Sequence, residues 1–158
     1  MVVISSGQIL LAPLFYGVIG AGGVFSAASS SFTYLELARQ VKQGDAKVII
    51  ASPDCVDVAV KAAKESGLDE GSVLVLDSMG GKHKRSIRRV DGKGADAVQG
   101  EGRPEERLQW EVITDPTILE NRVICLLYSS GTTGVPKGEF LTICRWTQMA
   151  LRPFKTSW

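Results

Sequence analysis

AKVIIASPDCVDVAVKAAKESGLDEGSVLVLD, residues 46–77, contains the pattern of a strand, a helix and a second strand. Its opening AKVIIA (46–51) is rich in β-branched residues, which is typical of a buried strand. SPD (52–54) follows, with a serine suited to cap a helix and a proline suited to its first turn. The next apolar residues share one helical face: Val56, Ala59, Val60 and Ala63. Gly67 ends that helix and SVLVLD (72–77) predicts a second strand, so the stretch predicts one βαβ unit.

A second helix is expected just upstream of this unit. Thr33 and Glu36 have the spacing of a capping box, and Gly44 stops the helix. Its apolar face is expected to contain Tyr34, Leu37, Ala38 and Val41. Before it, residues 23–28 are interpreted as a short strand. The order strand, helix, strand, helix, strand predicts an α/β fold: a βαβαβ parallel sheet with covering helices and right-handed crossovers.

The uncharged stretch ILLAPLFYGVIGAGGVFSAA (9–28) is long enough to be considered as a membrane span. However, no Lys or Arg precedes it to set an orientation, and it contains Pro13 and several glycines. The preferred interpretation is a helix from Gly7 to about Ala21 that is apolar on nearly all sides and leads into the strand at 23–28. A single-span membrane protein remains the less favoured alternative.

Composition narrows the classes of function. The chain has 158 residues, of which 44% are hydrophobic, as expected for one domain with a core. Eighteen basic and 17 acidic residues balance, so no overall field favours nucleic acid as a partner. The three cysteines, Cys55, Cys125 and Cys144, are far apart and are interpreted as reduced, mostly buried thiols. The single histidine, His83, lies in a basic run, so neither a catalytic cysteine nor a metal site is expected.

Residues 78–109 differ from the segments around them. Glycines and charged residues dominate, and large apolar side chains are almost absent. This composition predicts a long flexible loop. The run KHKRSIRR (82–89) has no interleaved aromatic residue for stacking on bases, so it is interpreted as a solvated part of that loop.

The segment LLYSSGTTGVPKGEF (126–140) begins within the expected strand VICLLY (123–128). It combines hydroxyl donors and Lys137 with glycines, which let backbone N–H groups converge on an anion. That composition suits a polyphosphate, and the alternative is an ordinary hairpin turn. Pro136 precedes the lysine where a Walker loop has glycine, and GAGGVF (20–25) does not fit the Rossmann glycine pattern.

These residues resemble the phosphate loop of the adenylate-forming (AMP-binding) enzymes, a superfamily that includes acyl-CoA synthetases, 4-coumarate:CoA ligases and luciferase. LLYSSGTTGVPKG (126–138) matches the family signature, a hydrophobic residue followed by S-S-G-T-T-G-x-P-K-G, at every position. Residues 17–52 are similar to the family's preceding helices and strands as well, so the resemblance covers about residues 2–138. It is closest to the 4-coumarate:CoA ligase-like acyl-CoA ligases, and it implies an incomplete subdomain of an N-terminal domain.

The resemblance implies a two-step reaction in which a carboxylic acid is adenylated by ATP and then transferred to the thiol of coenzyme A. Mg-ATP and CoA are thus the implied cofactors, and a carboxylic acid is the implied substrate. The implied role of the loop is to hold the β- and γ-phosphates through Ser129, Ser130, Gly131, Thr132, Thr133, Gly134 and Lys137. No catalytic and no metal-binding residue is assigned.

The chain departs from the family pattern after the loop. The family motifs for adenine, for ribose and for the adenylation lysine do not occur. Residues 1–138 are therefore expected to be a partial AMP-binding domain, a ligase fragment that is inactive as it stands. The alternative is a non-catalytic remnant that binds a nucleotide or a partner. No signal peptide is evident, so a cytoplasmic location is expected, and no oligomeric state is indicated.

The similarity stops at Glu139, where the family has a buried valine. Residues 139–158 are accordingly expected to be a tail outside the family domain. Gly-Glu-Phe (138–140) can be encoded by a sequence that contains an intron donor, which suggests a retained intron as its origin. A buried, unpaired carboxylate at Glu139 would be costly, so an exposed strand is the alternative there.

Overall fold

The computed structural model describes residues 1–78, 85–93, 113–129 and 137–143. Its seven strands form one sheet in the order β5-β4-β3-β1-β2-β6-β7. They are β1 (Val2–Ile4), β2 (Phe25–Ala28), β3 (Ile49–Ala51), β4 (Val73–Asp77), β5 (Ser86–Arg89), β6 (Val123–Ser129) and β7 (Lys137–Thr142). The neighbouring strands from β4 across to β6 are parallel, and the two edge strands β5 and β7 are antiparallel to their neighbours. The predicted α/β sheet is thus confirmed, with antiparallel strands at its edges.

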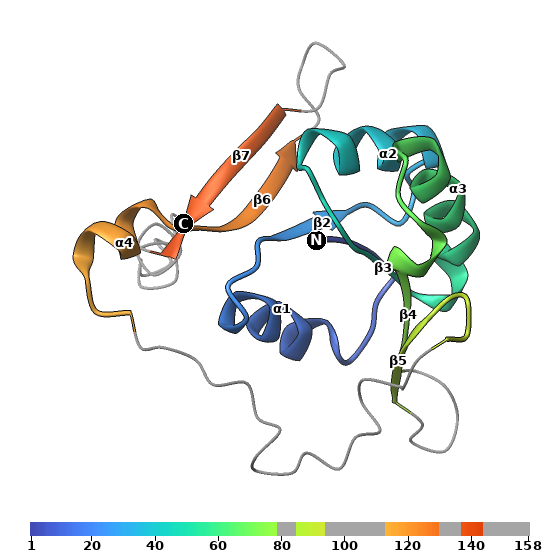
Figure 1. Cartoon of the computed structure of the whole chain (residues 1–158), viewed down its shortest axis with the longest axis horizontal. Helices are drawn as coiled ribbons and strands as arrows, with labels where there is room; N and C mark the ends of the chain where they lie inside the picture. Colours follow the sequence, from blue (N-terminus) through green and yellow to red (C-terminus); the bar gives the residue numbers. More distant parts are fainter. Residues whose placement is uncertain (79–84, 94–112, 130–136, 144–158) are drawn as a thin grey trace, which may run out of the picture.

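Helices lie on both faces of this sheet (Figure 1). α2 (Tyr34–Gln43) and α3 (Val56–Ser66) lie together on one face, and α1 (Leu11–Gly20) lies on the other. The remaining helical segments are η1 (Pro53–Cys55), η2 (Glu70–Ser72) and α4 (Pro116–Asn121). Because side chains alternate along a strand, Val2 and Ile4 pack in the core under α2 and α3, whereas Val3 packs in the core beside α1.

The capping box predicted for α2 is confirmed. Thr33 Oγ1 accepts from the backbone N–H of Glu36 at 3.4 Å, and Glu36 Oε2 accepts from the backbone N–H of Thr33 at 2.8 Å. The predicted face is buried at Leu37, Ala38 and Val41, but Tyr34 is exposed. Gln40 is buried instead, where its Nε2 donates to Ser26 Oγ at 2.8 Å and to the carbonyl of Ala27 at 3.0 Å. The packing face is therefore rotated toward the partners that this amide finds on β2.

The prediction for the first helix was wrong in its extent and burial. α1 begins at Leu11 rather than Gly7, and only Val18 is fully buried. Tyr16 is 64% exposed, because no element of the described residues covers the outer side of α1. Among the described ranges, no helix has the length and apolar character needed to cross a membrane.

Two strands were not predicted. β1 has only three residues, yet it lies between β2 and β3 at the centre of the sheet. β5 lies within residues 78–109, which were predicted to be a loop. Its Arg88 and Arg89 are exposed, so the strand is defined by its pairing with β4 rather than by an apolar pattern. The predicted loop is therefore interrupted by a short edge strand, and 79–84 and 94–109 lie outside the described residues.

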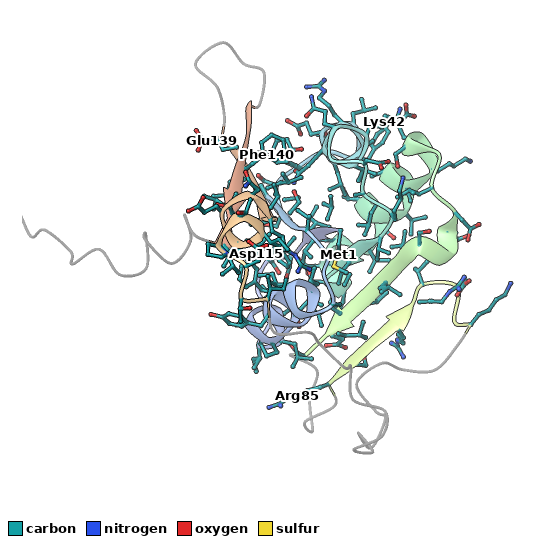
Figure 2. All side chains as sticks on the ribbon, turned by 60° about the vertical axis from the view of Figure 1, so that its left-hand side comes forward. Met1, Lys42, Arg85, Asp115, Glu139 and Phe140 are labelled. Atoms are coloured by element: carbon teal, nitrogen blue, oxygen red, sulfur yellow. The ribbon has the colours of Figure 1, made fainter. Side chains whose placement is uncertain are left out.

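β7 continues beyond Gly138 into the predicted tail. Leu141 is buried at 3% exposure and pairs with Cys125 of β6. Glu139 and Phe140 leave the strand on opposite sides, and both are exposed (Figure 2). The carboxylate of Glu139 thus lies on an exposed strand. This was the alternative to a buried carboxylate at this position.

Candidate functional site

The described part of the candidate site is the base of the phosphate loop. β6 and β7 pair in antiparallel fashion, and Ser129 is the register partner of Lys137. The two ends of the loop are therefore held opposite each other by the strand ladder. Five predicted site residues lie outside the described residues: Ser130, Gly131, Thr132, Thr133 and Gly134. The side chains of Ser129 and Lys137 lie outside them as well. Their contacts with phosphate stay a prediction.

This base lies at the edge of the sheet where the parallel strands end. A serine directly follows β1, β2, β3 and β4, and β6 itself ends in serine: Ser5, Ser29, Ser52, Ser78 and Ser129. In open α/β sheets, ligands bind outside the carboxyl ends of the strands. The loop is therefore on the side of the sheet where a ligand is expected.

Side-chain hydrogen bonds join the segments at this edge. Gln8 Oε1 accepts from the backbone N–H and from the hydroxyl of Ser78, both at 2.7 Å. The backbone N–H of Leu10 donates to Ser78 Oγ at 3.3 Å, and that of Ser6 donates to Ser52 Oγ at 3.4 Å. The connection between β1 and α1 is thereby tied to the ends of β3 and β4, which stiffens the edge beside the site.

The structure describes the environment of one aspartate and two cysteines in this part of the sheet. Hydrogen bonds from Ser52 and Ser6 lower the pKa of Asp54, so its carboxylate stays ionised at neutral pH. Burial raises the pKa of the Cys55 thiol, and burial raises the pKa of Cys125 as well. Both are free and buried, as the sequence predicted, and a raised pKa disfavours the thiolate that a nucleophilic cysteine needs. Cys144 lies outside the described residues, which contain no cluster suited to a metal ion.

Two residues at the base of the loop were not singled out from the sequence. Tyr128 of β6 is the register partner of Gly138 of β7, and a Cβ atom on that glycine would lie 3.2 Å from the tyrosine ring. The signal was present in the motif, because the tyrosine and the glycine flank the loop. Their pairing across two strands, however, depends on the register, which only the structure supplies.

This chain is similar to known proteins in both its sequence and its fold. The sequence model of the AMP-binding enzyme family matches residues 4–153, which includes the loop and extends past Gly138. The predicted boundary at Gly138 stays a prediction. A protein of Emericella nidulans, provisionally named an acyl-coenzyme A synthetase, is 44% identical over 96% of this chain and 27% of its own length. 4-Coumarate–CoA ligase 1 of Arabidopsis thaliana is 33% identical over 77% of this chain and 20% of its own length.

The crystal structure of ATP-bound MatB from Rhodopseudomonas palustris has the same fold, with a TM-score of 0.64 at 22% identity. The superposition covers 95% of this chain and 26% of MatB. The chain thus spans about a quarter of the length of the proteins that it matches. Since the family match covers nearly all of the chain, including the loop between β6 and β7, this chain belongs to the AMP-binding enzyme family.

Proposed function

We propose that this chain supplies the phosphate-binding part of an ATP-dependent acyl-CoA ligase. The observation that carries the proposal is the complete loop signature at 126–138, on a strand pair at the ligand-binding edge of an AMP-binding fold. The relatives named as an acyl-coenzyme A synthetase and a 4-coumarate–CoA ligase support the reaction class. ATP in the MatB structure supports ATP as the nucleotide.

The proposed reaction has two steps. A carboxylate oxygen attacks the α-phosphorus of ATP, the bond to the bridging oxygen breaks, and pyrophosphate leaves. The sulfur of CoA then attacks the acyl carbon of the adenylate, so that AMP leaves and the thiol proton is lost to the medium. Negative charge grows on the departing β- and γ-phosphates in the first step, and stabilising such charge is a large part of catalysis in this kind of transfer.

The loop residues are proposed to provide that stabilisation. Backbone N–H groups at Gly131 and Gly134, the hydroxyls of the serines and threonines, and the ammonium group of Lys137 are all donors to phosphate oxygens. No residue of this chain is assigned to the Mg²⁺ that accompanies ATP. The motifs for adenine and ribose are not present either, so we expect the chain to bind pyrophosphate about as well as ATP and to complete no reaction by itself.

Calorimetry with pyrophosphate and with Mg-ATP tests the phosphate-binding role. Lys137→Ala is expected to weaken binding of both anions about tenfold, because a charge-assisted hydrogen bond is lost. Lys61→Ala is the matched control, since Lys61 is exposed on α3 and should leave the affinity unchanged. An unchanged affinity in Lys137→Ala would mean that the loop does not bind these anions.

A non-catalytic nucleotide- or partner-binding remnant is the alternative, and exchange of label between ATP and pyrophosphate tests whether this chain catalyses adenylation by itself. Exchange that depends on an added aryl or fatty acid would establish the ligase reaction in the chain itself. Anion binding without exchange would fit the remnant and our expectation of a ligase part that is inactive alone. A substantially tighter affinity for ATP than for pyrophosphate would reveal a base-binding site that the proposal does not contain.

A further inference from the structure

Tyr128 occupies a space that two glycines leave open. A Cβ atom built on Gly138 would lie 3.2 Å from Cε1 and 3.4 Å from Cζ of the Tyr128 ring. At the other end of the ring, a Cβ atom on Gly44 would lie 3.6 Å from the tyrosine hydroxyl oxygen. Gly138 belongs to β7 and Gly44 caps α2, so the ring joins two elements that are far apart in the sequence.

The packing around this ring is close. A recess with room for about one water molecule lies beside it, lined by Phe32, Gln40 and Gln43 among others. Burial raises the pKa of the Tyr128 hydroxyl, as expected when a ring is withdrawn from water. A Cβ atom built on Gly44 would also lie 3.3 Å from Cδ1 of Leu126, which is two residues before Tyr128 on β6. The end of α2 therefore packs directly on the strand that leads into the loop.

We propose that Tyr128 is a positioning residue for the phosphate loop: its ring, held between Gly44 and Gly138, fixes the register that places Ser129 opposite Lys137. The inference rests on the proposed function of the loop. The ring is one residue before Ser129, and Gly138 is one residue after Lys137, so the contact lies at the first rung below the loop.

The same contact disfavours any other register. Phe140 is the next residue of β7 on the face of Gly138, and a shift by two residues would bring its ring against that of Tyr128. A shift by one residue would place Lys137 or Glu139 there and would turn the whole strand over. Either slip moves the Lys137 backbone by about 3.3 Å or more along the strand, which is enough to carry its ammonium group away from a phosphate.

The test is a double-mutant cycle in the 158-residue chain, read by the Kd for pyrophosphate and, in parallel, by the urea midpoint of unfolding. Gly138→Ala and Tyr128→Leu are each expected to weaken binding about tenfold at temperatures where the variants stay folded. Tyr128→Phe keeps the ring atoms that face Gly138 and should lose much less affinity than Tyr128→Leu. Adding Tyr128→Leu to Gly138→Ala should cost little further, because Tyr128→Leu removes the ring atoms that the new methyl group at position 138 meets.

Gly17→Ala is the matched control, since a Cβ there has no neighbour within 4 Å. A ring that served stability alone would lower the urea midpoint of Tyr128→Leu and leave the pyrophosphate Kd of the folded protein unchanged, which would overturn the inference. So would strictly additive effects of Gly138→Ala and Tyr128→Leu on the affinity. If the unchanged chain binds no pyrophosphate, the proposed function itself is wrong and the inference falls with it.

Discussion

Single residues define the ends of the helices in this fold, and these were the most predictable features. Thr33 and Glu36 satisfy each other's backbone N–H groups at the start of α2, and Gly67 ends α3 in the left-handed conformation at a φ of 80°. Both features depend on residues within one turn, so the sequence contains all the information needed. Burial is less local. Tyr34 was expected on the buried face and is exposed, whereas Gln40 is buried, because its hydrogen-bond partners lie on β2.

The capping box makes stability depend on pH in a defined direction. The backbone N–H of Thr33, followed by its hydroxyl, lowers the pKa of Glu36 below its ordinary value of 4.5. A carboxylate whose pKa is lowered by folding stabilises the folded state above the unfolded pKa, and the contribution is lost as the pH falls through the folded pKa. In Glu36→Gln, which can still accept a hydrogen bond, the fall in unfolding free energy between about pH 5 and pH 3 should be shallower than in the unchanged chain. Urea titrations at several pH values measure the unfolding free energy of both proteins. An equal dependence of that free energy on pH in the two proteins would contradict the prediction.

Among the elements, those with a repeating pattern were predicted and those defined by pairing were missed. α2, α3 and β4 have enough residues to show helical or strand character. β1 is three apolar residues, and only its partners β2 and β3 make it the central strand. The loop between β6 and β7 is the reverse case. Its predicted role rests on residue types alone and stays a prediction, whereas the register that holds its ends came only from the structure.

β7 offers a test of how firmly this edge element is held. Leu141 is 3% exposed, whereas its neighbour Phe140 is 64% exposed on the opposite face of the strand. Leu141→Ala should therefore lower the free energy of unfolding by about 2–3 kcal/mol, and Phe140→Ala should change it by about 0.5 kcal/mol or less. Urea denaturation of the two variants gives the comparison. Equal effects would mean that β7 does not pack on the core in solution.

At the scale of the whole molecule, the two faces of the sheet are covered to different degrees. α2 and α3 bury a continuous core on one face. On the other face, α1 leaves an apolar groove of about 420 Å³ that runs beside β1 and β2. Its lining includes Val3, Leu11, Phe15, Tyr16 and Phe25. Exposed apolar grooves of this kind are prone to association, so the molecule has one well-packed half and one half with accessible apolar surface.

This asymmetry predicts that the chain aggregates through the face of α1. Tyr16 is 64% exposed at the rim of the groove, so Tyr16→Glu should add a charge there at little cost to folding. The variant should bind less of a hydrophobic dye and stay monodisperse at higher protein concentration than the unchanged chain, as light scattering would measure. Tyr34→Glu is the matched control, because Tyr34 is also an exposed tyrosine but lies at the start of α2 on the opposite face. If Tyr34→Glu suppressed aggregation as strongly as Tyr16→Glu, added charge rather than the groove would be the cause, because a charge at α2 does not cover the apolar surface beside α1.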